Sequence, residues 1–367
     1  MKTMNIGFTG LDRLYDAYSW RLTRRAKAVW KTGKVVIGRH VATSEVAQFE
    51  NNIAKYTKRE YGVAVGSGTD ALYFALKTKG IGPGKNVLCP AISFIATAEA
   101  IKRTGANVEF IDVDDNGQIG ALTPINKVDA VVYVNLFGNL ANYDQLKRFC
   151  EERKVPLIED AAQSLGSFYK KIPSGKLGDI SILSFAPTKP LPSFGSGGMV
   201  LCDTLEEANE IRAYRYHGTG PIRISHGYHS LLAEDRAIML NFLFSKYKRL
   251  LKKRAKVRKW YDKNLENTYI QTISSAKNTI SNNHKLVIKV TNRDELQIFL
   301  ANKGIETQIH YKKPMSEMHF FKKDPLVNGY LRAEGFCKQV ISLPIYPHLT
   351  KEEVEYICKC IEEYYGL

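Results

Sequence analysis

Short apolar runs alternate with longer amphipathic stretches through the first half of the chain. Polar or turn-forming residues bound each run, as they bound β-strands, and the stretches between them have the periodicity of helices. This alternation predicts a mostly parallel sheet with helices on both faces. The predicted strands are residues 62–65, 86–89, 107–112, 130–135, 156–159, 180–184 and 198–202.

Further helices are predicted on either side of this region. Residues from about 12 to 60 have a helical pattern, interrupted near Gly33 and Gly38. A second helical region follows Leu205 and is broken around 219–228 by Gly, Pro and Ser. Toward the C-terminus, strand-like runs at 285–290, 307–310 and 340–343 mix with helices at 293–303 and 351–365.

We therefore expect an α/β protein of two domains, for which 367 residues are enough. The large domain would comprise residues 1–250, with the mostly parallel sheet, its flanking helices and the N-terminal helical segment. The smaller, α+β domain would comprise residues 251–367.

The composition, 44% hydrophobic and 25% charged, is ordinary for a globular enzyme. No apolar stretch is long enough to span a bilayer, and residues 1–12 lack the apolar core of a signal peptide, so we expect a cytoplasmic protein without a membrane partner. The six cysteines have no metal-ligand spacing. We expect free thiols and no metal site.

The net charge of +16 is high, and much of it lies in residues 246–260. Leu250, Leu251, Ala255 and Val257 give this segment the pattern of a helix with one apolar side and a long basic face. Nucleic-acid binding is one interpretation, but no nucleic-acid motif accompanies the charge. A solvated helix face is favoured, and the positive field would attract a phosphorylated substrate.

Two residues, Asp160 and Lys189, suggest a specific chemistry. Asp160 ends a buried strand, which places its carboxylate at the sheet edge where ligands of α/β proteins bind. Lys189 lies in a segment too rich in Pro and Gly to be a helix. A pyridoxal phosphate enzyme needs such a pair: the lysine forms the Schiff base and the aspartate keeps the pyridine nitrogen protonated. Each residue alone is more often a helix cap or a solvated charge.

Residues 65–72, Val-Gly-Ser-Gly-Thr-Asp-Ala-Leu, join a strand to a helix through a small-residue turn. Ser67 or Thr69 can cap the helix while free N–H groups point outward, which makes a phosphate site. The turn also fits the dinucleotide fingerprint. That fingerprint needs an acidic residue at the end of the next strand, and residues 86–90 offer none, so NAD is excluded. A phosphate anchor or a plain helix cap remains.

Further candidates follow other predicted strands. Phe94 could stack on a flat cofactor ring or pack in the core. Gln163 could bond a phenolic or hydroxyl oxygen, and Ser184 a phosphate. His310 and Tyr311 could close over a substrate or serve the structure alone.

These motifs, in this order and spacing, resemble the sugar aminotransferases of the DegT/DnrJ/EryC1/StrS family, fold-type-I pyridoxal phosphate enzymes that act on nucleotide-linked keto sugars. The resemblance covers nearly the whole chain. It includes residues 33–38, 49–50, 66–72, 80–84, 94–97, 159–163, 178–179, 184–189, 197–198, 304–305, 310–311 and 342–346.

The resemblance implies a role for each candidate. Lys189 would be the Schiff-base lysine and proton shuttle, and Asp160 would pair with the pyridine nitrogen. The cofactor's other contacts would be Phe94, stacked on the ring, Gln163 on its phenolic oxygen, and Gly68, Thr69 and Ser184 on its phosphate. His310 and Tyr311 would face the sugar nucleotide. The active site would be shared between the subunits of a homodimer.

The sequence departs from the family pattern in three places. Where the family often has G-x-N-x-R, with the Asn reaching the neighbouring subunit's cofactor, residues 227–231 place His229 and Leu231. His229 can still donate a hydrogen bond, but the Arg is missing; Arg223 and Arg236 are the candidates to replace it. Ser196 stands where an acidic residue is common. Ala186 and Pro192 stand where an aromatic residue and a Gly are frequent.

The expected activity is transfer of an amino group from L-glutamate to a keto nucleotide-sugar, in a ping-pong cycle through pyridoxamine phosphate. The loop around Lys189 is more similar to members that act at C3 than to those that act at C4. A dehydratase of the same family would have His in place of Lys189. A catalytically inactive binding or regulatory protein is the other alternative, suggested by the altered 227–231 segment.

Overall fold

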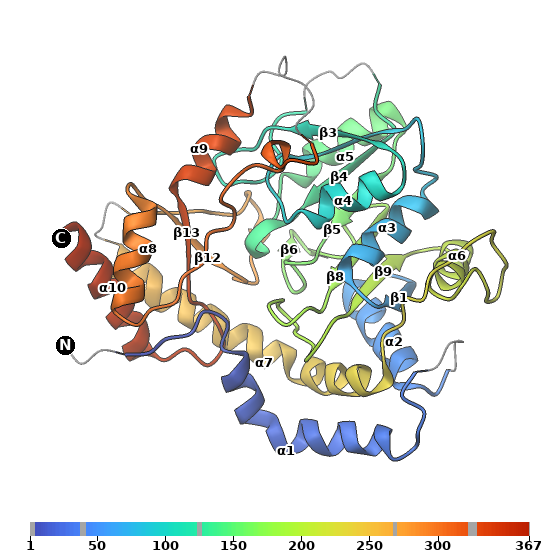
Figure 1. Ribbon diagram of the computed structural model, residues 1–367, viewed down its shortest axis with the longest axis horizontal. Coiled ribbons are helices and arrows are strands. Elements are labelled where there is room, and N and C mark those ends of the chain that lie inside the picture. Colours follow the sequence, from blue (N-terminus) through green and yellow to red (C-terminus); the bar gives the residue numbers. More distant parts are fainter. Residues whose placement is uncertain (1–3, 37–41, 123–126, 267–269, 322–328, 367) are drawn as a thin grey trace.

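The computed structural model describes residues 4–36, 42–122, 127–266, 270–321 and 329–366. Its main feature is a seven-stranded sheet of order β1-β9-β8-β5-β4-β2-β3, in which β9 alone runs antiparallel to both of its neighbours (Figure 1). The mostly parallel sheet predicted from the sequence is confirmed. The strands are β1 (Tyr61–Val65), β2 (Asn86–Pro90), β3 (Asn107–Ile111), β4 (Ala130–Val134), β5 (Leu157–Asp160), β8 (Ile180–Ser184) and β9 (Gly198–Cys202).

Helices cover both faces of the sheet because successive strand residues point to opposite sides. Val63 and Val65 pack in one cluster with α3 (Gly68–Thr78), α4 (Ala96–Arg103) and α6 (Leu205–Arg215). Ala64, between them, packs in another cluster with α2 (Glu45–Thr57) and the long helix α7 (Glu234–Leu265). The helix α5 (Tyr143–Arg153) covers β4 and β5 on that second face.

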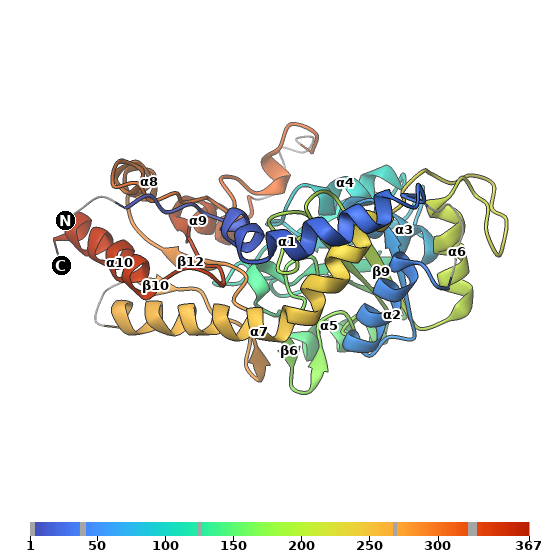
Figure 2. The ribbon, with the colours of Figure 1, turned by 90° about the horizontal axis from the view of Figure 1, so that it is seen from below.

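The C-terminal part has its own apolar cluster, built on a three-stranded sheet of β10 (Gln271–Thr272), β12 (Leu286–Lys289) and β13 (Val340–Leu343). The helices of this part are α8 (Arg293–Asn302), α9 (Leu331–Gln339) and α10 (Lys351–Tyr365). Helix α7 reaches from the large sheet to this part, with α1 (Leu11–Trp30) packed beside its first half (Figure 2). It therefore crosses the expected boundary between residues 250 and 251, and the division into domains stays a prediction.

The remaining elements are short. They are the sheet of β6 (Phe168–Tyr169), β7 (Ile172–Pro173) and β11 (Thr279–Ile280), and the 3-10 turns η1 (Leu136–Gly138) and η2 (Met315–Glu317). The strand predicted at 307–310 is reduced to a single bridge between Gln308 and Ser342, and α9 was not predicted at all. Gly38, expected to interrupt the N-terminal helices, lies outside the described residues.

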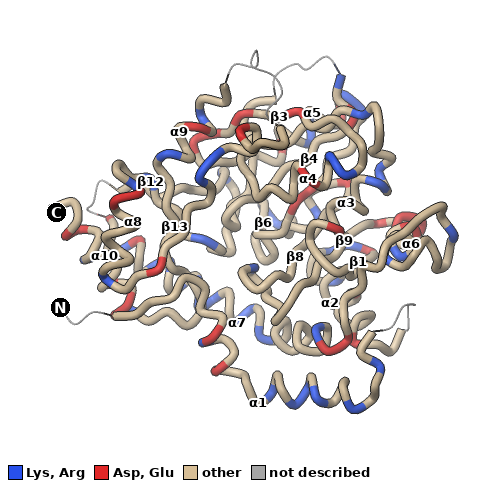
Figure 3. The backbone as a smooth tube through the Cα atoms, in the orientation of Figure 1, with Lys and Arg blue, Asp and Glu red and all other residues tan. Residues whose placement is uncertain are grey.

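The basic segment forms the helix that the sequence predicts. Within α7, Leu250 and Val257 are buried, whereas Lys248, Lys252 and Lys256 are exposed. Figure 3 places other basic residues along α1 and over much of the molecule, so the positive charge is spread widely. In the described part of the chain, none of the helices has the combination of length and apolar character that a membrane crossing requires.

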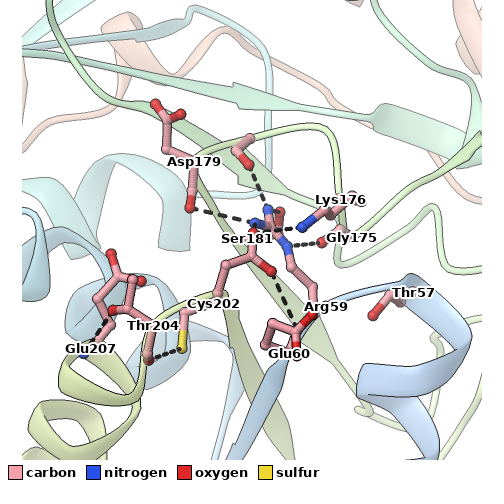
Figure 4. A network of polar contacts seen from close by, with 12 residues as sticks. Thr57, Arg59, Glu60, Gly175, Lys176, Asp179, Ser181, Cys202, Thr204 and Glu207 are labelled. Atoms are coloured by element: carbon pink, nitrogen blue, oxygen red, sulfur yellow. Dashed lines mark hydrogen bonds and ion pairs between the residues drawn. The ribbon is translucent and has the colours of Figure 1, made fainter.

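A buried arginine ties the edge of the large sheet together (Figure 4). The guanidinium of Arg59, just before β1, donates hydrogen bonds to the carbonyls of Gly175 and Gly178 and to the hydroxyl of Ser181 on β8. It also pairs with the carboxylate of Asp203, which follows β9, at 2.6 Å. One side chain thus links the start of β1 to β8, to the end of β9 and to the loop before β8.

Candidate active site

A cavity of about 590 Å³ lies at the C-terminal ends of β5 and β8, between the N-terminus of α3 and the C-terminal part. All of the predicted site residues except His229 line it: Gly68, Thr69, Phe94, Asp160, Gln163, Ser184, Lys189, His310 and Tyr311. Its volume is in the range of small-molecule sites. Folding thus gathers residues that the sequence separates by more than 200 positions.

The orientation of Asp160 follows from that of its neighbour. Glu159 points to the opposite face of β5, where its buried carboxylate accepts hydrogen bonds from Asn135, Ser174, Gly175, Leu177 and Ser181. Because side chains alternate along a strand, this leaves the carboxylate of Asp160 facing the cavity. Asp160 accepts hydrogen bonds from the backbone N–H of Ala162 at 3.1 Å and from the hydroxyl of Thr97 at 3.2 Å. Thr97, which also bonds Ser93 at 2.9 Å, has a contact to the site that the sequence did not reveal.

Asp160 and Lys189 share a poorly solvated space. Burial raises the pKa of the Asp160 carboxyl, and the nearby charge of Lys189 opposes that rise. Burial lowers the pKa of the Lys189 amine, and Asp160 opposes that change. The Lys189 loop is fixed by backbone hydrogen bonds, from Lys189 N–H to the Ala186 carbonyl at 2.9 Å and from Ser193 N–H to the Phe185 carbonyl at 2.7 Å. The result is an amine disposed toward the neutral, nucleophilic form in a fixed loop.

The N-terminus of α3 forms a cradle beside Ser184. Helix geometry leaves the N–H groups of Gly68 and Thr69 without intrahelical acceptors, and Ser67 caps the helix by accepting from Asp70 N–H at 3.0 Å. A Cβ at Gly68 would lie 2.8 Å from the Cβ of Ser184, so only glycine allows these two elements to approach so closely. Free amide donors, a helix dipole and a hydroxyl are suited to a phosphate group.

The side chains of Phe94 and Gln163 complete the part of the cavity next to Asp160. Phe94 is 55% exposed, so the interpretation that it packs in the core is wrong, and its ring is available for stacking. The Gln163 amide accepts from the backbone N–H of Phe137 at 2.8 Å and donates to the Tyr311 hydroxyl at 3.4 Å. Gln163 thereby joins the large sheet to the C-terminal wall.

The C-terminal wall of the cavity, residues 284–285 and 308–311, holds His310 and a lysine that the sequence did not single out. His310 Nδ1 lies 2.9 Å from the Ser342 hydroxyl, and burial together with Lys285 and Lys189 lowers the pKa of His310 to about 3, so its ring is neutral. Lys285 lines the cavity, with its amine 4.7 Å from the centre of the Phe8 ring. Lys285 begins an apolar run in the sequence, where a lysine normally marks a solvated strand end.

His229 lies apart from this cavity. Its backbone bridges Tyr216, and its ring centre is 5.4 Å from that of His217. Arg236 is one of the two candidates to replace the missing family arginine. It lies close to Gly195 in the loop after Lys189, because a Cβ built on Gly195 would be 2.6 Å from Nη1 of Arg236. The expectation that His229 serves a neighbouring subunit stays a prediction.

Comparison with known proteins places this geometry in context. The model of the DegT/DnrJ/EryC1/StrS aminotransferase family matches residues 21–362. The chain is 32% identical, over 99% of both sequences, to a protein of Geobacillus stearothermophilus named "Pleiotropic regulatory protein". It is 31% identical to the UDP-2-acetamido-2-deoxy-3-oxo-D-glucuronate aminotransferase of Pseudomonas aeruginosa, over 88% of this chain and 92% of that one.

Two further similarities are to another sugar transaminase and to a solved structure. The UDP-4-amino-4,6-dideoxy-N-acetyl-beta-L-altrosamine transaminase of Campylobacter jejuni is 30% identical over 85% of this chain and 88% of its own. The crystal structure of S. venezuelae DesV in complex with a ketimine intermediate superimposes with a TM-score of 0.92 at 28% identity, covering 99% of each chain.

The mixed α/β fold is that of the aminotransferases among its relatives of known structure. Since the family model covers almost the whole sequence, the chain belongs to the DegT/DnrJ/EryC1/StrS aminotransferase family. The family resemblance seen in the sequence motifs is thereby confirmed.

Proposed function

We propose that the protein is a pyridoxal phosphate-dependent aminotransferase that converts a keto nucleotide-sugar to the amino sugar. The observation that carries the proposal is that Lys189, Asp160 and the N-terminus of α3 all line the same cavity. An amine of lowered pKa, a buried carboxylate and a phosphate cradle fit the reactive carbon, the ring nitrogen and the phosphate of that cofactor.

The residues divide the work of holding the cofactor. Gly68, Thr69 and Ser184 would bind its phosphate, Phe94 would stack on its ring, and Gln163 would bond its phenolic oxygen. When bound, pyridoxal phosphate supplies a conjugated ring that spreads the negative charge left on a carbon that loses its proton.

The protein's own groups would carry out the proton chemistry. Asp160, fixed by Thr97 and Ala162, would hold a proton on the ring nitrogen. The Lys189 amine, whose pKa burial lowers, would take the proton from the α-carbon of the amino donor. His310 and Tyr311 would face the sugar nucleotide.

For the donor we propose L-glutamate, and for the acceptor a 3-keto sugar in preference to a 4-keto sugar. The loop around Lys189 and the 3-oxo sugar in the name of the Pseudomonas relative support C3. The name of the Campylobacter relative points to C4, so both kinds of acceptor belong in the assay.

Visible absorbance of the purified protein tests the proposal. A cofactor band that bleaches on addition of L-glutamate and returns with a keto nucleotide-sugar is the expected result. Lys189→Ala should lower transamination at least about a hundredfold, whereas Lys289→Ala, on β12 outside the cavity, should not. A Lys189→Ala protein that still transaminates at the normal rate would contradict the proposal.

A regulatory protein without catalysis is the second candidate function. The name of the Geobacillus relative and the loss of the usual Asn and Arg at His229 and Leu231 favour it. It predicts tight nucleotide-sugar binding together with an absorbance band that glutamate does not change.

A further inference from the structure

The C-terminal wall of the cavity holds a cation that the proposed roles do not use. Lys285 lines the cavity together with Lys189, yet within the described residues no acidic side chain lies within ion-pairing distance of its amine. The amine lies 4.7 Å from the centre of the Phe8 ring, and Phe8 in turn stacks on His310. A buried cation without a carboxylate partner is costly unless a ligand supplies the opposite charge.

The charges around Lys285 add up to an excess of positive charge. Lys189 faces it from the loop after β8, and Arg254 from α7, where the guanidinium donates to the carbonyls of His284 and Ile345. The nearby rings are uncharged, since burial holds the pKa of His284 and His310 low and that of Tyr311 high. Asp160 is the one carboxylate that lines the cavity among the described residues. An anionic ligand would restore the balance.

The backbone of Lys285 is fixed with respect to the reacting edge of the sheet. Its N–H donates to the Phe137 carbonyl at 3.1 Å, and the Phe137 N–H donates to Gln163 at 2.8 Å. Two hydrogen bonds therefore connect Lys285 to the residue that lies three positions after Asp160. The amine is presented to the cavity from a fixed backbone, which is what selective binding requires.

His310 offers a second donor next to Lys285. Its Nδ1 lies 2.9 Å from the Ser342 hydroxyl, and when that hydroxyl donates, the ring proton resides on Nε2. A neutral imidazole N–H beside an ammonium group suits the two oxygens of a carboxylate. The phosphate cradle at α3 consists instead of backbone amides and hydroxyls, so the two anion sites differ in chemistry.

We propose that Lys285 and Nε2 of His310 form a carboxylate-binding site for a substrate in this cavity. The inference rests on the proposed aminotransferase function, which supplies two sources of a carboxylate. One is the amino donor, and the other is a sugar that bears a carboxylate, as the uronate in the name of the Pseudomonas relative does.

The protonation of Lys285 gives the site a pH signature. Burial, Lys189 and Arg254 lower the pKa of Lys285 to about 7. Below that pH the amine carries its charge and attracts a carboxylate; above it the charge is lost. Affinity for a carboxylate should therefore fall as the pH rises from 6 to 8.5.

Glutarate, a five-carbon dicarboxylate that cannot transaminate, is the probe. Its dissociation constant is measured by calorimetry with the holoenzyme at pH 6 and pH 8.5. Lys285→Met should weaken binding at pH 6 at least about tenfold, and Lys285→Arg should bind at both pH values because its charge is permanent. Lys289→Met, on the same strand but outside the cavity, is the matched control and should match the wild type.

The two half-reactions distinguish the sources of the carboxylate. If Lys285→Met raises the KM for L-glutamate, the donor is the ligand. The sugar is the ligand if Lys285→Met leaves the dissociation constant of glutarate and the KM for L-glutamate unchanged but removes the preference for a nucleotide-linked keto-uronate over the uncharged keto sugar. If Lys285→Met changes none of these, the inference is overturned. Glutarate binding that depends on Lys285 in a protein without transamination would overturn the proposed function and leave the carboxylate site standing.

Discussion

At the scale of single residues, Asp160 depends on Thr97. Two hydrogen bonds fix the Asp160 carboxylate, and one of them comes from the Thr97 hydroxyl at 3.2 Å. Burial is the largest cause that raises the pKa of Asp160, and the Thr97 hydroxyl is among the groups that oppose the rise. Under the proposed function, Thr97 would be a positioning residue that acts on the cofactor through Asp160.

We expect Thr97→Val to lower kcat about tenfold with little change in KM, since a hydrogen bond to a charged group is lost. The pKa of Asp160 should rise further, so the acid limb of the pH–rate profile should move to higher pH. Stopped-flow rates between pH 5 and 9 measure both effects. Thr97→Ser keeps the hydroxyl and should restore the normal profile. If Thr97 had a purely structural role, the pH–rate profile of Thr97→Val would not shift from that of the wild type.

The sequence predicts the residues at strand ends far better than those that reach the cavity from elsewhere. Asp160, Ser184 and Phe94 could be identified because a strand end marks the sheet edge where ligands bind. Thr97 lies inside a helix, and Lys285 belongs to no recognisable motif. Both acquire their place only when segments far apart in the sequence pack together.

At the scale of elements, the Arg59 network fixes the edge of the large sheet. The guanidinium is buried and bonds two carbonyls, a hydroxyl and Asp203. Because β8 ends at Ser184 and leads directly into the Lys189 loop, this anchor also holds one wall of the cavity in place.

Arg59→Met should lower the free energy of unfolding by about 2 to 4 kcal/mol, because it leaves the carbonyls of Gly175 and Gly178 without this donor and removes the buried partner of Asp203. Urea denaturation followed by circular dichroism is the measurement. Lys176→Met removes a half-buried cation from the same Asp203 and should cost less than about 1 kcal/mol. Equal losses for the two variants would contradict the role given to Arg59.

The sequence predicts the strands of the large sheet to within one or two residues, since each is an apolar run between turn signals. It does not predict their order, which depends on which strands pair in space. In the C-terminal part the pattern is weaker. The run at 307–310 pairs at Gln308 alone, and α9 has too few periodic apolar positions to be recognised.

At the scale of the whole molecule, we propose a homodimer with shared active sites. Trp20 and Tyr15 of α1 are 67% and 43% exposed, and large aromatic side chains at a surface are typical of protein interfaces. His229 lies outside the cavity of its own chain, so its predicted contact with a cofactor requires a second subunit.

Mixing inactive variants tests this arrangement. Lys189→Ala and His229→Ala should each be impaired as homodimers. Heterodimers would then contain one site with both changes and one with neither, so random reassociation should restore about a quarter of the wild-type activity. Mass photometry verifies the dimer. Absence of recovery in verified heterodimers would place His229 in its own subunit's site or in none.

Helix α7 sets a condition on how this chain can vary over evolutionary time. Its 32 residues extend about 48 Å and contribute to the apolar clusters of both the large sheet and the C-terminal part. Inserting one residue in its middle would rotate everything beyond by about 100° and carry Lys285 and His310 away from Lys189. Homologous recombination in this region can therefore exchange the exposed side chains of α7 but must conserve residue number, whereas the loop at 219–228 is under no such constraint of helical phase.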